Sequence, residues 1–288
     1  LEFRRVLFRS EMQEIYGINL STSAISIITN KVSQAATEWQ NRPLESLYMI
    51  VWMDGIVFKV RENGKVINKT VYLCVGLNKE GLKEVLGMWI GKNESAAFWM
   101  GVLTDLKARG VEDILITVTD NLNGFTETIK SVFPASTTQI CVVHQIRNSC
   151  RYVVWKEKKE FTADLKNIYN APTKEAAEME LDNFEQKWGA KYPYAIRSWR
   201  NNWEELTVFF DFPVEIRKII YTTNLIENLN GKIRKYTKNK LSFPNDDALK
   251  KSVYLAINEI EKKWYQPIWN WALIFNQFIT IFENRIQV

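Results

Sequence analysis

Two aspartates stand at matching places in this 288-residue sequence, each after a short run of strand-forming residues. Seven apolar residues precede Asp54, and a second run, residues 114–119, leads in the same way to Asp120. Runs this short, rich in branched and aromatic side chains, predict strands that are buried on both faces. One aspartate alone would be interpreted as a turn or helix-cap residue. Two at matching strand ends indicate a metal-binding carboxylate pair.

Glu227 is the third candidate carboxylate, and two interpretations of it are open. It stands three residues after Asn224 at the start of a predicted helix, so Asn224 could cap the helix while Glu227 closes a capping box. Alternatively, Glu227 completes the metal site from a helix that lies across the sheet.

A group of cations follows Glu227, with five positive charges in nine residues and no acid among them. Such a group is typical of a surface that faces phosphates, although a solvated helix face is the alternative. Its members are Lys232, Arg234, Lys235, Lys238 and Lys240.

The elements before residue 150 must position the two aspartates. A turn signal at residues 62–65 and a glycine-flanked turn near Gly81 join three strands that run up, down and up. A helical crossover then returns the next strand parallel to the first. If those strands are neighbours, about 4.8 Å apart, Asp54 and Asp120 meet at one edge and could clamp two metal ions about 3.5–4 Å apart. The predicted elements are a first strand, 47–54, from which the chain continues through 56–60 to the turn, then strands 70–77, 84–90, 114–120 and 139–143, and helices 94–109, 124–132 and one from His144.

The remaining segments have distinct compositions. Residues 1–10 show no clear period and are predicted to be a non-native scar of sequence assembly. Residues 11–43 predict a turn and a helix capped by Ser21 or Ser23. They are either the remnant of a helix-turn-helix DNA-binding region or an ordinary amphipathic helix. We expect an α/β unit in residues 44–150, completed with C-terminal helices by residues 215–288.

Residues 151–214 predict an inserted helical block. Its four tryptophans are expected to form most of the core of the block, with stacking of one of them on unpaired bases as the alternative. They are Trp155, Trp188, Trp199 and Trp203.

The bulk composition restricts the class of protein. A hydrophobic share of 46% can bury a large core, and the net charge of +5 suits a nucleic-acid partner without requiring one. Three cysteines without a CxxC pair favour a reducing, cytoplasmic setting over a disulfide framework. The apolar stretch 268–282 is shorter than the roughly 20 residues that a membrane span needs, so it predicts a buried helix.

Several segments together resemble the Mutator-type transposases of bacterial insertion sequences, a family of the DDE transposase superfamily. The resemblance runs from about Glu11 to the C-terminus, without most of the family's N-terminal DNA-binding region, so it implies an N-terminally truncated member. The segments that carry it are residues 41–54, 119–125, 133–134, 139–148 and 223–230.

The resemblance implies an α/β fold, a ribonuclease-H-like mixed five-stranded sheet with flanking helices and an inserted all-helical subdomain. It implies that Asp54, Asp120 and Glu227 are the catalytic metal ligands, for Mg²⁺ or Mn²⁺ and two ions. Cys141, His144 and Asn224 would support the active site, and Arg147 would join the DNA-binding cations. Because His144 is the only histidine, a zinc site with two histidines is excluded.

The expected activity is metal-dependent DNA strand cleavage and strand transfer. The partners would be double-stranded DNA, as terminal inverted repeats and target, and further copies of the chain in a homodimer or higher oligomer. The setting would be the bacterial cytoplasm and nucleoid, with no membrane. Two alternatives are open, a truncated non-catalytic DNA-binding remnant and a ribonuclease-H-like, structure-selective nuclease.

Overall fold

The computed structural model describes residues 21–92, 94–122, 124–221 and 224–286. Predictions for residues 1–20, which cover the suspected scar and the first part of the helix-turn-helix remnant, lie outside the described residues.

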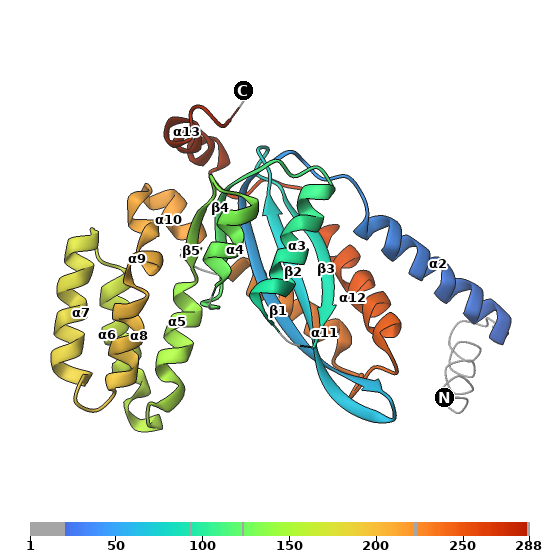
Figure 1. The fold of residues 1–288 in the computed structure, drawn as a ribbon, viewed down its shortest axis with the longest axis horizontal. Helices are drawn as coiled ribbons and strands as arrows, with labels where there is room; N and C mark the ends of the chain where they lie inside the picture. The colour runs from blue at the N-terminus through green and yellow to red at the C-terminus, as the bar shows by residue number, and fades with distance from the viewer. Residues whose placement is uncertain (1–20, 93, 123, 222–223, 287–288) are drawn as a thin grey trace.

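Five strands form one mixed sheet in the order β3-β2-β1-β4-β5. β1 pairs antiparallel with β2 and parallel with β4, β2 pairs antiparallel with β3, and β4 pairs parallel with β5. The predicted mixed five-stranded sheet of an α/β fold is confirmed, with β1 and β4 as neighbours (Figure 1). The strands are β1 (Leu47–Glu62), β2 (Lys65–Leu77), β3 (Lys83–Gly91), β4 (Asp113–Thr119) and β5 (Thr137–Ile140).

The predicted strand end at Asp54 is wrong, because β1 continues to Glu62. Gly55 does not break the strand. It allows β2 to approach closely, since a Cβ there would lie 2.7 Å from Cγ2 of Thr70. What ends near Asp54 is the pairing with β4, whose last partners are Trp52 and Val118. Beyond that point β1 pairs only with β2.

Helices cover both faces of the sheet. On one face, α3 and α4 bury Trp99 and Phe125 against Tyr48 and Met53 of β1. The other face holds the larger core, in which α11 and α12 pack against the sheet. The helices of this part are α2 (Thr22–Gln40), α3 (Ala96–Ala108), α4 (Phe125–Val132), α5 (Val142–Ser149), α11 (Asn224–Thr237), α12 (Asp246–Glu261) and α13 (Trp271–Ile281).

A block of short helices separates α5 from α11 and lies beyond the β5 edge of the sheet (Figure 1). Trp188, Trp199 and Trp203 are buried in it as predicted, but Trp155 is not part of that core, since 87% of its surface is exposed. The block contains η1 (Cys150–Tyr152), η2 (Trp155–Glu157), α6 (Lys158–Tyr169), α7 (Lys174–Trp188), α8 (Pro193–Asn201), α9 (Trp203–Leu206), η3 (Val208–Asp211) and α10 (Val214–Ile220).

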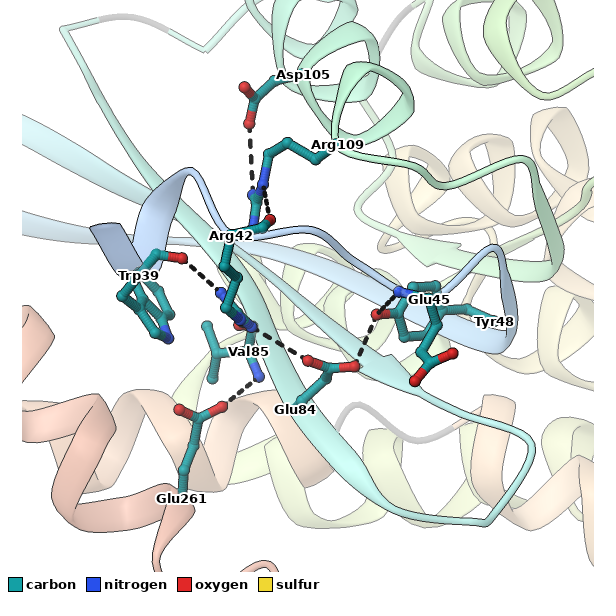
Figure 2. A network of polar contacts seen from close by, with 9 residues as sticks. All are labelled: Trp39, Arg42, Glu45, Tyr48, Glu84, Val85, Asp105, Arg109 and Glu261. Carbon is teal, nitrogen blue, oxygen red and sulfur yellow. Dashed lines mark hydrogen bonds and ion pairs between the residues drawn. The ribbon is translucent and has the colours of Figure 1, made fainter. Parts of the chain in front are cut away.

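Side chains from two helices satisfy the outer edge of β3. Gln40 of α2 accepts a hydrogen bond from the Met88 amide, at 2.9 Å. Arg42 donates to the Val85 carbonyl at 2.8 Å, and Glu261 of α12 accepts from the Val85 amide at 2.7 Å (Figure 2). An unpaired strand edge would invite pairing with other chains, so these contacts close the sheet and fix α2 to it.

The C-terminal apolar segment forms α13, which is less buried than predicted. Only Ile274 and Phe278 of the helix are fully buried, because the helix packs one face on the domain and leaves the other to solvent. Within the described part of the chain, no helix is long and apolar enough to cross a bilayer.

Candidate active site

Asp54 is positioned by the alternation of β1. Its neighbours on the same face of the strand, Trp52 and Ile56, belong to the large core that also contains Ile226 and Leu229 of α11. Successive side chains of a strand point to opposite faces, so Asp54 shares the face that α11 covers. The carboxylate is only 8% exposed, and it lies just past the place where β4 separates from β1.

Asp120 follows the last residue of β4 and meets His144 of α5. Oδ1 of Asp120 and Nδ1 of His144 form a close ion pair. Cys141 caps α5 and its Sγ accepts a hydrogen bond from the His144 amide at 3.3 Å, which explains why the helix begins at Val142 and not at His144 as predicted. Ligand atoms of Asp54, Asp120 and His144 all lie within 4.8 Å of one another.

Burial and neighbouring charges shift the pKa values of Asp54 and His144. Burial, and after it the negative charge of Asp120, raise the pKa of Asp54 to about 7. Burial acts to lower the pKa of His144, but its contacts with Asp120 and Cys141 outweigh burial and raise that pKa to about 11. The histidine is therefore a cation at neutral pH and offsets part of the negative charge of the two aspartates.

The helix α11 brings Asn230 into contact with Asp54, but Glu227, which it also carries, is not in the described group of ligand atoms that lie within 4.8 Å of one another. Nδ2 of Asn230 donates a hydrogen bond to Oδ2 of Asp54 at 2.6 Å. Glu227 lies one turn earlier on the same face of α11, and its charge also acts to raise the pKa of Asp54. Its carboxylate is paired with Nη2 of Arg147 at 2.7 Å. The side chain of Asn224, predicted to support the site, lies outside the described residues.

The donor set suits a hard divalent cation. Carboxylate oxygens are the ligands that Mg²⁺ and Mn²⁺ prefer, and Asp54 and Asp120 offer them side by side. Burial, and after it the charge of Asp120, raise the pKa of Asp54, and a bound divalent cation would offset both effects by favouring the ionised carboxylate. The residues present therefore fit a metal ion.

A family model described as "Transposase, Mutator family" matches residues 5–267. The chain belongs to the Mutator family of transposases. A probable transposase for an insertion sequence element ISRM3-like from Sinorhizobium fredii is 44% identical over 96% of this chain and 70% of its own length. The transposase for ISRM3 from Rhizobium meliloti gives the same three values.

More distant proteins agree with this membership. A probable insertion-sequence transposase from Corynebacterium diphtheriae is 40% identical over 86% of this Mutator-family chain and 72% of its own length. Among solved structures, the chain is similar to part of a simian T-cell lymphotropic virus intasome in complex with the PP2A regulatory subunit B56 gamma. The match covers 51% of this chain and 50% of the intasome chain. Its identity of 15% and TM-score of 0.25 are too low to carry an argument.

The predicted DNA-binding cations of this Mutator-family chain do not share one surface. Arg234 stands seven residues after Glu227, two turns along the same face of α11. Three of the others line a pocket of about 350 Å³ together with Lys263, which follows the end of α12; they are Lys232, Lys235 and Lys238. Lys240 instead donates to Oγ of Ser252 at 2.7 Å and lies over the Phe243 ring, and burial lowers its pKa.

Two residues near the site were not foreseen from the sequence. Asn230 lies in the segment 223–230, and its spacing of three residues from Glu227 is the signal that both side chains share one face of the helix. Glu94 precedes α3 and accepts a hydrogen bond from Nε1 of Trp99 at 2.9 Å. Partial desolvation raises its pKa, and the charge of Asp120 adds to the rise, which places Glu94 at the rim of the cluster. No sequence pattern marked it.

Proposed function

We propose that this chain is a DDE transposase that catalyses metal-dependent DNA strand cleavage and strand transfer of an insertion sequence. Asp54, Asp120 and Glu227 are its proposed ligands for Mg²⁺ or Mn²⁺, with two ions bound. The observation that carries the proposal is the meeting of Asp54 and Asp120 from adjacent strands, beneath the helix that bears Glu227. Membership of a transposase family supports it.

Three residues would hold the proposed metal ligands in position: Asn230, His144 and Arg147. Asn230 holds one oxygen of Asp54 and leaves the carboxylate oriented toward Asp120. His144 orders Asp120, and Arg147 orders Glu227 and offers positive charge beside the reacting phosphate. Divalent ions held by Asp54, Asp120 and Glu227 would supply activation of the attacking oxygen and stabilisation of the leaving oxygen.

The substrate class follows from the proposed reaction. The partners are double-stranded DNA, first as the terminal inverted repeats of the element and then as target DNA. Arg147 and Arg234 would provide phosphate contacts beside the carboxylates, and Lys232, Lys235 and Lys238 would provide them from a second surface. A homodimer or higher oligomer would hold both ends of an element, and the reaction belongs in the bacterial cytoplasm, at the nucleoid.

The first experiment replaces one ligand without changing its size. Asp54→Asn removes the negative charge, so we expect Mg²⁺-dependent cleavage of a duplex carrying an element end to fall by at least about 100-fold. Binding of the same duplex in a gel-shift assay should change less than about threefold, because phosphate contacts and not the carboxylate dominate affinity. Asp211→Asn, at an exposed aspartate of η3, is the matched control.

Retained cleavage in Asp54→Asn would defeat the assignment of this ligand. The two alternative functions give different outcomes. A non-catalytic DNA-binding remnant binds the element end and never cleaves it. A structure-selective nuclease hydrolyses DNA but does not join a pre-cut 3′ end to a second duplex, which a strand-transfer assay measures directly.

A further inference from the structure

A group of exposed apolar side chains lies at the junction of η1, η2 and α8, which we call the aromatic tip. Its members are Tyr152, Val154, Trp155 and Tyr194, whose surfaces are 64%, 52%, 87% and 51% exposed. The rings of Tyr152 and Tyr194 meet edge to face, with centroids 5.5 Å apart. Val153, between the exposed residues, is buried and fixes the segment to the core.

One face of α5 connects the aromatic tip to the carboxylates. His144 contacts Asp120 at the start of that helix, and Arg147, one turn later, contacts Glu227. Arg151 is exposed in η1, just beyond the end of α5, and its guanidinium lies 5.7 Å from the Tyr152 ring centroid. At about 1.5 Å per residue, α5 rises by roughly 8 Å from His144 to its end at Ser149, which is more than two base steps, and η1 continues from there. Figure 1 shows α5 extending from the β5 edge of the sheet beside α6 and α8.

The charge around the aromatic tip suits an anionic partner. The nearby acids are already paired, Glu157 with Lys191 and Glu160 with Lys187. Arg151 and Lys156 are exposed next to the rings. Exposed aromatic rings flanked by cations that follow a groove or ridge are the features that bind single strands, because rings stack on bases while cations hold phosphates.

We propose that the aromatic tip binds unpaired nucleotides of the DNA strand beside the cleavage site, with Trp155 stacking on a base and Arg151 contacting the backbone. This inference rests on the proposed function and adds to it a second contact surface that holds no metal ligand. Paired bases within a duplex present no free face to a ring, so the occupant is an unpaired end and not an intact helix.

The test compares two DNAs and three forms of the full chain, without divalent cations so that nothing is cleaved. One DNA is a blunt duplex carrying the element end, and the other has the same duplex with three unpaired nucleotides at that end. We expect Trp155→Ala to weaken binding of the tailed DNA by roughly 5- to 100-fold in fluorescence anisotropy, and binding of the blunt duplex by less than twofold. Trp155→Phe should retain most of the preference for the tail.

Trp269→Ala is the matched control, because Trp269 is 88% exposed and lies outside the helical block. It should leave both affinities unchanged. A 2-aminopurine base placed in the tail should lose fluorescence when the unaltered protein binds, and keep it with Trp155→Ala. Arg151→Gln should weaken binding of the tailed DNA. It should also reduce the slope of log affinity against log salt concentration by about one, the value for one lost phosphate contact.

Three outcomes would overturn the inference. Equal losses on the tailed and blunt DNAs would remove the role of unpaired bases, and equal effects of Trp155→Ala and Trp269→Ala would remove the specificity of the tip. A change in oligomeric state with Trp155→Ala, measured by sedimentation, would make the tip an interface between copies of the chain. Failure of the unaltered protein to bind either DNA would defeat both this inference and the proposed function. A protein that binds the tailed DNA through Trp155 but does not cleave DNA when Mg²⁺ is added would contradict only the proposed function.

Discussion

At the scale of single residues, the carboxylate of Asp54 depends on a neighbour from a distant part of the chain. The Asp54 side chain accepts hydrogen bonds from the Gly55 amide at 2.7 Å and from Nδ2 of Asn230 at 2.6 Å. The first bond is local, but the second crosses from β1 to α11. Asn230 therefore couples the position of Asp54 to the helix that carries Glu227.

Asn230→Ala should reduce Mg²⁺-dependent cleavage by about 10- to 100-fold, because groups that orient metal ligands contribute this much to metal affinity or activity. The effect should shrink when the Mg²⁺ concentration is raised, which a titration of cleavage rate against Mg²⁺ measures. Asn228→Ala, at an exposed asparagine of the same helix, is the control and should behave as the unaltered chain. Equal rates for both variants at low Mg²⁺ would show that Asn230 does not position the site.

At the scale of elements, α2 is attached to the sheet by a small number of polar side chains. Arg42 contributes most of them, with hydrogen bonds to the carbonyls of Trp39 and Val85 and an ion pair to Glu84 at 3.1 Å. Its guanidinium also lies 5.0 Å from the Trp39 ring centroid (Figure 2). The part of α2 from residue 26 to residue 31 is exposed all round, so this junction decides how firmly the helix is held.

Arg42→Ala should lower the free energy of unfolding by about 1–3 kcal/mol, because it removes charge-assisted hydrogen bonds at a partly buried place. Hydrogen exchange of the amides of α2 should accelerate more than exchange in β1, which mass spectrometry resolves. Lys31→Ala, on the exposed part of the same helix, should change neither quantity. Unchanged exchange in Arg42→Ala would mean that packing against α12 alone holds α2.

The strands and their order were predictable because local patterns and short turns specify them. The apolar run before Asp54, the turn at residues 62–65 and one helical crossover leave few possible sheets. The continuation of β1 past Asp54 was not predicted, because whether a strand ends at a charge depends on its partner, here the close approach of Thr70 to Gly55. The exposure of Trp155 could not be predicted from its residue type, because it depends on the orientation of the short helix η2 relative to the helical block.

The partners of the site were only partly predictable for the same reason. Asp54 and Asp120 were marked by matching strand ends, and their proximity followed from topology. The ion pair between Arg147 and Glu227 joins α5 to α11, which the helical block separates along the chain. No local sequence pattern could predict a contact between residues so far apart in sequence. The separation of Lys240 from the other cations depends on its contact with Ser252, which lies in α12.

At the scale of the whole molecule, the helical block and the sheet share one continuous core. A fully buried glutamine, Gln139 of β5, joins them. Its Nε2 donates to the Leu206 carbonyl at 2.8 Å, and its Oε1 accepts from the Phe209 amide at 2.7 Å. These bonds satisfy backbone groups of α9 and η3 that would otherwise be buried without partners.

Gln139→Leu should therefore destabilise the whole chain by about 2–5 kcal/mol, because it leaves two buried backbone groups unsatisfied. Unfolding followed by tryptophan fluorescence and by circular dichroism should still coincide in one transition. Gln186→Leu, at an exposed position of α7, should cost little. Two separate transitions in the unaltered protein would show that the block and the sheet unfold independently.

The unbroken course of β1 has a consequence for a reaction in two steps. Asp54 lies inside a ladder that binds its strand to β2 on both sides of it, so its backbone is fixed. Asp120 comes after the end of β4, and Glu227 belongs to a separate helix, so neither is held by the ladder that fixes Asp54. In the proposed reaction, Asp54 would therefore keep one position in both steps, and any adjustment of Asp120 or Glu227 would have to involve His144 or Arg147, with which they are paired.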